Sequence, residues 1–138
     1  MKIETTTDLA ACHALRRAVF IDEQGVPEAD ELDDQDDGAI HLLAWQDGQP
    51  VGSARILVQG DTGKIGRVCV LAPMRGTGLG AALIGAALDV LRDQPGVARA
   101  KLGSQTHAIG FYEKLGFTAH GPVYDDAGIP HRDMIREL

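Results

Sequence analysis

The sequence has few aromatic residues, few cysteines and no long apolar run. Aromatic residues make up 4% of the 138 positions, and the two cysteines are Cys12 and Cys69. Both lie within apolar patterns, which excludes a disulfide-rich secreted domain and predicts buried thiols. No apolar run approaches the ~20 residues of a membrane span, and the chain does not begin with a signal-like pattern. We therefore expect a cytoplasmic protein that does not contact a membrane.

Positive charge is also scarce. The chain has 13 Lys and Arg residues against 20 Asp and Glu residues, and its formal net charge is −7. A nucleic-acid-binding protein needs a basic face to neutralise phosphates, so this class is excluded. The length predicts one domain, which can bury about two thirds of its unfolded surface without disulfides or metals. The partner is expected to be small, or itself cationic.

Against this background, a glycine-rich segment is the most informative feature. Residues 75–80 read RGTGLG, between an apolar run at residues 65–71 and a helical pattern at residues 81–91. A strand that turns through glycines into a helix directs backbone N–H groups and the positive end of the helix dipole at one point. The segment therefore predicts a binding site for a phosphate or diphosphate.

The spacing separates the possible phosphate-binding loops. A nucleotide-hydrolase loop needs Lys followed by Ser or Thr, but Ala81 and Ala82 occupy these positions. A dinucleotide-binding turn needs an acidic residue ~20 positions further on, and residues 98–103 contain none. A plain connector remains an alternative. The pattern Arg-x-x-Gly-x-Gly, from Arg75 to Gly80, resembles the acyl-CoA binding loop of the GNAT superfamily of N-acyltransferases.

A second segment strengthens this resemblance. Residues 102–117 read LGSQTHAIGFYEKLGF and resemble the other GNAT signature, a strand followed by a helix that ends in Phe-Tyr-x-Lys-x-Gly-Phe. Residues 19–25, the acidic run through Asp37, His41 and residues 128–134 resemble the ElaA-type acetyltransferases, a small bacterial branch. The resemblance extends from about residue 15 to the C-terminus. Gln105 departs from it, because many GNAT proteins have Asn there.

The patterns predict an α/β fold in a single domain spanning residues 1–138. We expect a mixed, mostly antiparallel sheet with helices on both faces. The strand before the glycine segment and the strand after its helix are expected to be parallel neighbours joined by a right-handed crossover. The resemblance implies that this pair splays apart. The expected elements are a helix from Thr6 or Thr7 to near Gly25, strands at 39–46, 51–59 and 64–71, a helix at 79–92, a strand at 98–103, a helix at 106–115, and strands at 117–124 and 132–137.

The resemblance implies acetyl-CoA as cosubstrate and no metal. In the splayed pair, unpaired backbone groups demand a partner, and the pantetheine arm is expected to supply it. The N–H groups of residues 75–81 are expected to hold the diphosphate. The expected acetyl-CoA contacts are Val68, Cys69, Val70, Arg75, Gly76, Thr77, Gly78, Leu79, Gly80, Ala81, Gln105 and Tyr112.

Acyl transfer to an amine needs a polarised thioester, a neutral nucleophile and a proton for the departing thiolate. A backbone N–H near Val70 is expected to stabilise the negative oxygen that forms. Through the Phe-Tyr motif, the resemblance implies that Tyr112 is the acid, because a phenol with a pKa of ~10 protonates a thiolate. The base is left open among Glu23, His41 and His131, which are expected to line the acceptor site together.

The segment at residues 28–37 holds seven carboxylates in ten residues. An EF-hand is excluded, because Gln35 occupies the third loop position and Ala44 the place of the bidentate Glu. Two interpretations stay open. The segment is either a solvated, mobile loop, or its charges draw a cationic amine towards the cleft.

The sequence thus predicts an acetyl-CoA-dependent N-acetyltransferase that transfers directly to a small, cationic primary amine. Cys69 is disfavoured as an acyl-carrying nucleophile, because an apolar setting raises the pKa of a thiol. A non-catalytic acyl-CoA sensor and an enzyme similar to the acyl-homoserine lactone synthases are the alternatives, and the short chain disfavours the second. The sequence is compatible with a monomer or with a homodimer through the sheet edge at residues 117–138, which carries few charges between Phe117 and Tyr124.

Overall fold

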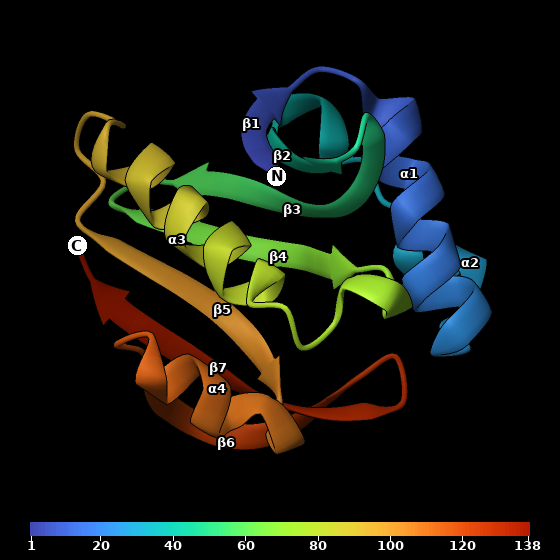
Figure 1. Cartoon of the computed structure of the whole chain (residues 1–138). Coiled ribbons are helices and arrows are strands. Elements are labelled where there is room, and N and C mark those ends of the chain that lie inside the picture. Colours follow the sequence, from blue (N-terminus) through green and yellow to red (C-terminus); the bar gives the residue numbers. More distant parts are fainter.

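A mixed seven-stranded sheet forms the centre of the molecule. The computed structural model describes residues 1–138, and the strand order is β1-β2-β3-β4-β5-β7-β6 (Figure 1). The strands are β1 (Lys2–Thr6), β2 (Ile40–Gln46), β3 (Gln49–Gln59), β4 (Thr62–Val70), β5 (Arg99–Gln105), β6 (Thr118–Asp126) and β7 (Ile129–Glu137). The α-helices are α1 (Leu9–Arg16), α2 (Glu28–Glu31), α3 (Leu79–Arg92) and α4 (Ile109–Lys114). A π-helical segment, Arg17–Glu23, continues α1, and 3₁₀ turns lie at Asp36–Gly38, Ala72–Met74 and Thr106–Ala108.

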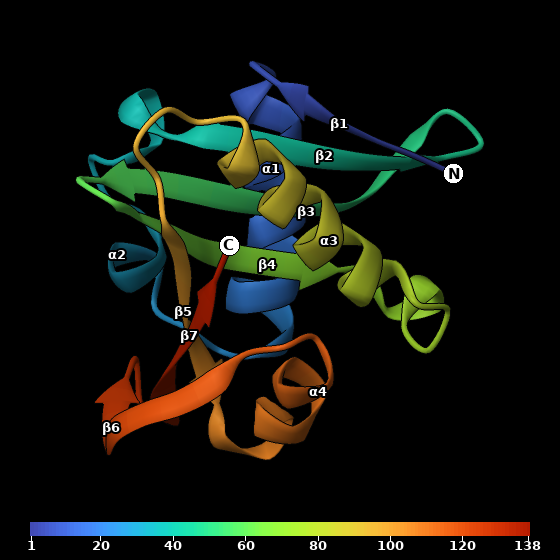
Figure 2. The ribbon, with the colours of Figure 1, turned by 90° about the vertical axis from the view of Figure 1, so that its left-hand side faces the viewer.

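The helices cover both faces of the sheet, as the sequence predicted. Consecutive residues of a strand point to opposite faces, so Leu42 and Leu43 of β2 belong to different clusters. Leu42 packs with Leu83 and the other apolar residues of α3, whereas Leu43 packs with Leu15 of α1. Figure 2 shows strands β2, β3 and β4 between α3 in front and α1 behind. None of the helices is long and apolar enough to span a membrane.

Strands β4 and β5 are parallel only at their beginnings. Their register covers Thr62, Gly63 and Lys64 of β4, after which the two strands separate. On its other edge β4 stays paired with β3, but the register shifts between Ser53 and Arg55. This bulge leaves Arg67 with a φ of +50°, and bulges bend the strand that carries them. The splayed parallel pair is therefore confirmed.

The beginning of the chain differs from the sequence-based expectation. Residues Lys2–Thr6 form β1, which pairs antiparallel with β2 and was not predicted. The helix cap is neither Thr6 nor Thr7, because the Asp8 carboxylate accepts the N–H of Ala11 at 3.1 Å. Thr6 instead ends the strand. No buried residue occurs in β1, so its strand conformation depends on pairing with β2 rather than on its own apolar pattern.

The acidic segment at residues 28–37 also differs from the first of its two interpretations, a solvated, mobile loop. It contains the short helix α2 and a 3₁₀ turn, and it buries Glu31 and Asp36, which are 4% and 8% exposed. Buried carboxylates need cationic or hydrogen-bonding partners, and three arginines provide them. The segment is therefore not fully solvated, although its other five carboxylates are exposed.

Candidate active site

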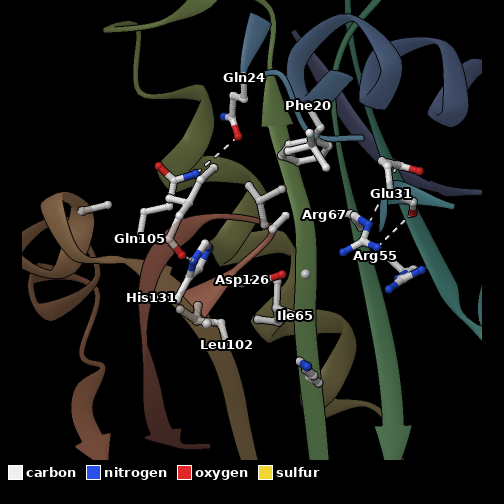
Figure 3. A pocket seen from close by; sticks show the side chains of 18 of the residues that line it. Phe20, Gln24, Glu31, Arg55, Ile65, Arg67, Leu102, Gln105, Asp126 and His131 are labelled. Atoms are coloured by element: carbon white, nitrogen blue, oxygen red, sulfur yellow. Dashed lines mark hydrogen bonds and ion pairs between the residues drawn. The ribbon is translucent and has the colours of Figure 1, made fainter. Parts of the chain in front are cut away.

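A cavity of about 340 Å³ lies where β4 and β5 separate. Its walls come from β4, β5, the π-helical segment after α1, helix α4 and the β6–β7 hairpin (Figure 3). Among the residues predicted for the site, the cavity is lined by Val68, Gln105, Tyr112 and His131. The strand separation thus creates the space that these four residues line.

The glycine segment forms a corner between β4 and α3 that has unused backbone donors. Gly76 and Gly78 have φ values of +78° and +88°, which residues with a side chain rarely adopt. The N–H of Arg75, expected among the diphosphate donors, instead donates to Ala72 O at 3.2 Å. No acceptor in the protein binds the N–H groups of residues 76–81, and the next bonded one is Ala82 N–H, which donates to Gly78 O at 3.0 Å. These donors lie at the positive end of the α3 dipole. The corner therefore fits an anion such as a diphosphate.

Two side chains of this corner are fixed by local bonds. Arg75 Nε donates to Val70 O at 3.1 Å, and the Arg75 guanidinium forms an ion pair with Glu23 at 2.8 Å. The Thr77 hydroxyl donates to Met74 O at 2.5 Å. Glu23 therefore neutralises Arg75 and is not among the residues lining the cavity, whereas the next residue, Gln24, lines it.

Cys69 lies on the other side of the sheet from α3. Its side chain is 3% exposed and packs with Cys12 and Leu43 against α1. Its Sγ lies 3.2 Å from Ser53 Oγ. Burial raises the pKa of the Cys69 thiol to about 11, so the thiol is protonated at neutral pH. Only the backbone of Cys69 remains as a possible contact for a ligand.

Tyr112 reaches the cavity from α4. Its ring packs edge-on against Phe111 and Phe117, with centroids 5.0 Å and 6.1 Å away. Its hydroxyl forms no hydrogen bond within the protein, and burial raises its pKa. The hydroxyl is therefore protonated at neutral pH and can donate to a ligand atom in the cavity.

His131 lines the cavity from β7, directly beside the end of β5. Its Nδ1 lies 2.8 Å from Ile129 O, and because a carbonyl only accepts, Nδ1 carries the hydrogen. In the neutral ring, Nε2 is then left as an acceptor. Tyr124 stacks on the ring with a centroid distance of 6.0 Å. Gln105, the register partner of His131, donates from Nε2 to Gln24 Oε1 at 3.4 Å (Figure 3).

The structure places His41 away from this group. His41 lies on β2, is 4% exposed, and is hydrogen-bonded through Nε2 to Asp36 O at 2.8 Å. It does not line the cavity. The expectation that Glu23, His41 and His131 line one acceptor site together is therefore corrected, since of the three only His131 does so. The location of His41 depends on the direction of its side chain in strand β2 and on the position of the acidic segment. Neither can be read from the sequence.

Sequence reasoning missed a cluster of three arginines and three carboxylates beside the cavity. We call it the arginine–carboxylate cluster, and its members are Arg16, Arg55, Arg67, Glu31, Asp33 and Asp36. Arg16 is 2.5 Å from Glu31 and 2.9 Å from Asp36. Arg55 is 2.8 Å from Asp33 and 3.1 Å from Asp36. The sequence did contain one sign of this cluster: Arg55 is a charged residue within the otherwise uncharged strand β3.

The ionisation of the cluster follows from these contacts. Burial alone would raise the pKa of Asp36, but hydrogen bonds from Arg16, His13 and Arg55 hold it well below its usual range. The pKa of Asp33 is lowered in the same way, since burial is outweighed by Arg55. Burial would lower the pKa of Arg16, but bonds to Glu31 and Asp36 raise it. Arg16, Asp33 and Asp36 are therefore charged at neutral pH.

The fold and the site together define a class of protein. The acetyltransferase (GNAT) domain matches residues 7–138, so the chain belongs to the GNAT acetyltransferase family. This confirms the expected acyltransferase, and members of the family use acetyl-CoA.

Individual relatives match over nearly the whole chain. Protein YyaT of Bacillus subtilis is 39% identical over 140 residues, which cover 99% of this chain and 94% of that protein. Protein ElaA of Escherichia coli is 36% identical over 138 residues, covering 97% and 90%. The crystal structure of an acyl-CoA N-acyltransferase from Pseudomonas aeruginosa has a TM-score of 0.87 and 32% identity, covering 99% of both chains.

Proposed function

We propose that this protein transfers an acetyl group directly from acetyl-CoA to a primary amine. The observation that carries the proposal is the row of unbonded N–H groups at residues 76–81, next to the gap between β4 and β5. These donors suit the diphosphate of CoA. The β4 backbone at Val68–Val70 then offers hydrogen bonds to the pantetheine arm, since β5 no longer pairs with it.

The side chains of the cavity divide the chemistry between them. His131 Nε2 accepts a proton from the acceptor ammonium, which leaves a neutral amine. The amine nitrogen attacks the thioester carbon, so that a C–N bond forms and the C–S bond breaks. A backbone N–H near Val70 stabilises the carbonyl oxygen while it is negative. The Tyr112 hydroxyl donates its proton to the departing sulfur, and the second proton that the attacking nitrogen loses passes through solvent to the Tyr112 oxygen. The proton on His131 is released to solvent, so that one proton is produced per turnover.

The first experiment measures thiol release from acetyl-CoA with a panel of primary amines. The wild-type protein is expected to release CoA only when an amine is present. Tyr112→Phe and His131→Gln are each expected to lower kcat by roughly 100-fold or more, because each removes a proton-transfer group. The affinity for CoA, measured by calorimetry, is expected to stay within about twofold, since the diphosphate donors are backbone groups.

His120→Gln is the matched control. His120 lies on the exposed strand β6 and does not line the cavity. Its replacement is expected to leave kcat and CoA affinity unchanged. The proposal fails if no amine in the panel stimulates CoA release, or if His131→Gln and His120→Gln have the same kcat.

A further inference from the structure

The cavity of the proposed acetyltransferase has polar side chains on two opposite sides of strand β4. His131 and Gln105 lie on one side of strand β4, and Arg55 and Arg67 lie on the other (Figure 3). All four residues line the same cavity. The thioester is expected beside His131 and Tyr112, so Arg67 faces the part of an acceptor that does not react.

Arg67 is held at the cavity wall by an unusual backbone conformation. Its φ of +50° lies in the left-handed region, which costs a residue with a side chain on the order of 1–3 kcal/mol. The bulge in β4 maintains this conformation, and its guanidinium extends to the acidic segment, where Nη2 donates to Glu31 O at 2.9 Å. A residue chosen only for strand formation would avoid this conformation.

The ion pairs of Arg67 are looser than those of its neighbours. Its Nη2 lies 3.4 Å from Asp33 Oδ2, and its Nε lies 3.8 Å from Glu31 Oε1, which is too far for a hydrogen bond. Its Nη1 has no partner in the protein, and its buried Nε has no hydrogen-bond acceptor. Arg16 and Arg55, in contrast, reach carboxylates at 2.5 to 2.9 Å. Nη1 of Arg67 therefore remains as an unused donor, whereas the donors without a partner in Arg16 (Nη2) and Arg55 (Nε) are buried.

The carboxylates near Arg67 do not offset its burial and the charges of the two neighbouring arginines. Burial lowers the pKa of Arg67, and the neighbouring charges of Arg55 and Arg16 lower it as well. Glu31 and Asp33 act in the opposite direction but do not compensate. An additional anion in contact with Arg67 would relieve this deficit. A planar carboxylate matches the guanidinium with two N–H donors, which makes it the best fit among small anions.

We propose that the acceptor carries a carboxylate as well as its primary amine, and that Arg67 binds this carboxylate while His131 receives the amine. The inference rests on the proposed acetyl transfer and narrows its acceptor to an amino-acid-like zwitterion. It modifies the expectation of a purely cationic acceptor. A cavity of about 340 Å³ has room for a small molecule of this kind beside the thioester.

The first test compares matched acceptors. Each common L-amino acid is assayed beside its carboxamide and its decarboxylated amine, with thiol release from acetyl-CoA as the readout. For the acceptors that react, the wild-type kcat/KM is expected to be roughly 10-fold to 100-fold higher for the carboxylate form. Arg67→Gln is expected to bring this ratio close to one, and Arg67→Lys is expected to restore part of it.

Arg92→Gln is the matched control, because Arg92 lies at the end of α3 and pairs only with Asp89. It is expected to keep the wild-type ratio. A wild-type ratio near or below one overturns the proposal, as does an unchanged ratio in Arg67→Gln. The structural alternative, in which Arg67 only holds the acidic segment, predicts equal losses for the carboxylate and carboxamide forms.

A second measurement does not depend on turnover. N-acetyl amino acids and their neutral N-methylamides are titrated by calorimetry into the protein saturated with CoA. The carboxylates are expected to bind roughly 10-fold more tightly, and Arg67→Gln is expected to remove the difference. If CoA binds but no N-acetyl amino acid binds better than its amide, the carboxylate site is refuted and the transferase proposal stands. If CoA itself neither binds nor is released, both proposals are refuted.

Discussion

The arginine–carboxylate cluster and the glycine corner both lie close to strand β4, but they differ in whether their polar groups are bonded within the protein. In the cluster, buried charges find partners within the protein at 2.5 to 3.1 Å. At the corner, the N–H groups of residues 76–81 find none. Polar groups that are paired internally hold the fold together, whereas unpaired ones at a cavity are available to a ligand. Arg67 belongs to the cluster but, like the corner, keeps a donor without a partner, which is why we assign it a ligand.

The largest effect is expected from removing one charge of the cluster. Asp36→Asn removes the buried carboxylate that lies 2.9 Å from Arg16 and 3.1 Å from Arg55, and breaking a buried ion pair costs about 3–5 kcal/mol. We expect the free energy of unfolding, measured with urea, to fall by about this amount. Asp37→Asn is the control, because Asp37 is exposed and forms no ion pair. Equal stability of the two variants would contradict the internal role of the cluster.

The second prediction concerns the stability of the protein at low pH. The folded-state pKa values of Asp33 and Asp36 lie below their ordinary value of 3.8. Their contribution to stability is therefore fully present above that value and is lost as the pH falls below it towards the folded-state pKa values. We expect the free energy of unfolding to decrease in this window. The decrease is expected to be smaller in Asp36→Asn, and an equal slope in both proteins would refute the assignment.

A substitution in the glycine corner is expected to weaken ligand binding more than it lowers the stability of the fold. Gly78→Ala places a side chain at a φ of +88°, which costs about 1–2 kcal/mol and displaces the N–H donors. We expect the Kd for CoA to rise by roughly tenfold. Gly85→Ala, on the exposed side of α3 with no atom near the new Cβ, is the control. It is expected to leave the Kd unchanged and to add up to about 1 kcal/mol of stability.

The smallest effect is expected from breaking the ion pair between Glu23 and Arg75. Glu23 and Arg75 are 39% and 46% exposed in their side chains, and such pairs contribute only about 0–1 kcal/mol. We expect Glu23→Gln to change the free energy of unfolding and the Kd for CoA only within this range. A loss of activity as large as that of His131→Gln would identify Glu23 as the base instead.

Local patterns predicted much of the fold. Helix α3 occurs at Leu79–Arg92, as expected, because an Ala- and Leu-rich segment between glycines and Pro95 specifies its own ends. The hairpin of β2 and β3 turns at Asp47 and Gly48, whose φ values of +52° and +77° suit a tight hairpin turn. The element order from β2 to β7 was also predicted. Strand β1 was not, because its apolar pattern is weak.

For the site, the sequence specified the glycine corner and the Phe-Tyr motif, because both depend on consecutive residues. Tertiary structure alone decided which distant side chains share the cavity. It placed His131 and Tyr112 in the wall of one cavity, and it placed His41 beside the acidic segment. It also buried Glu31 and Asp36 against three arginines. The reason is physical: a turn or a helix end is determined by neighbours in the chain, whereas the partner of a buried charge depends on strand register and on the packing of remote segments.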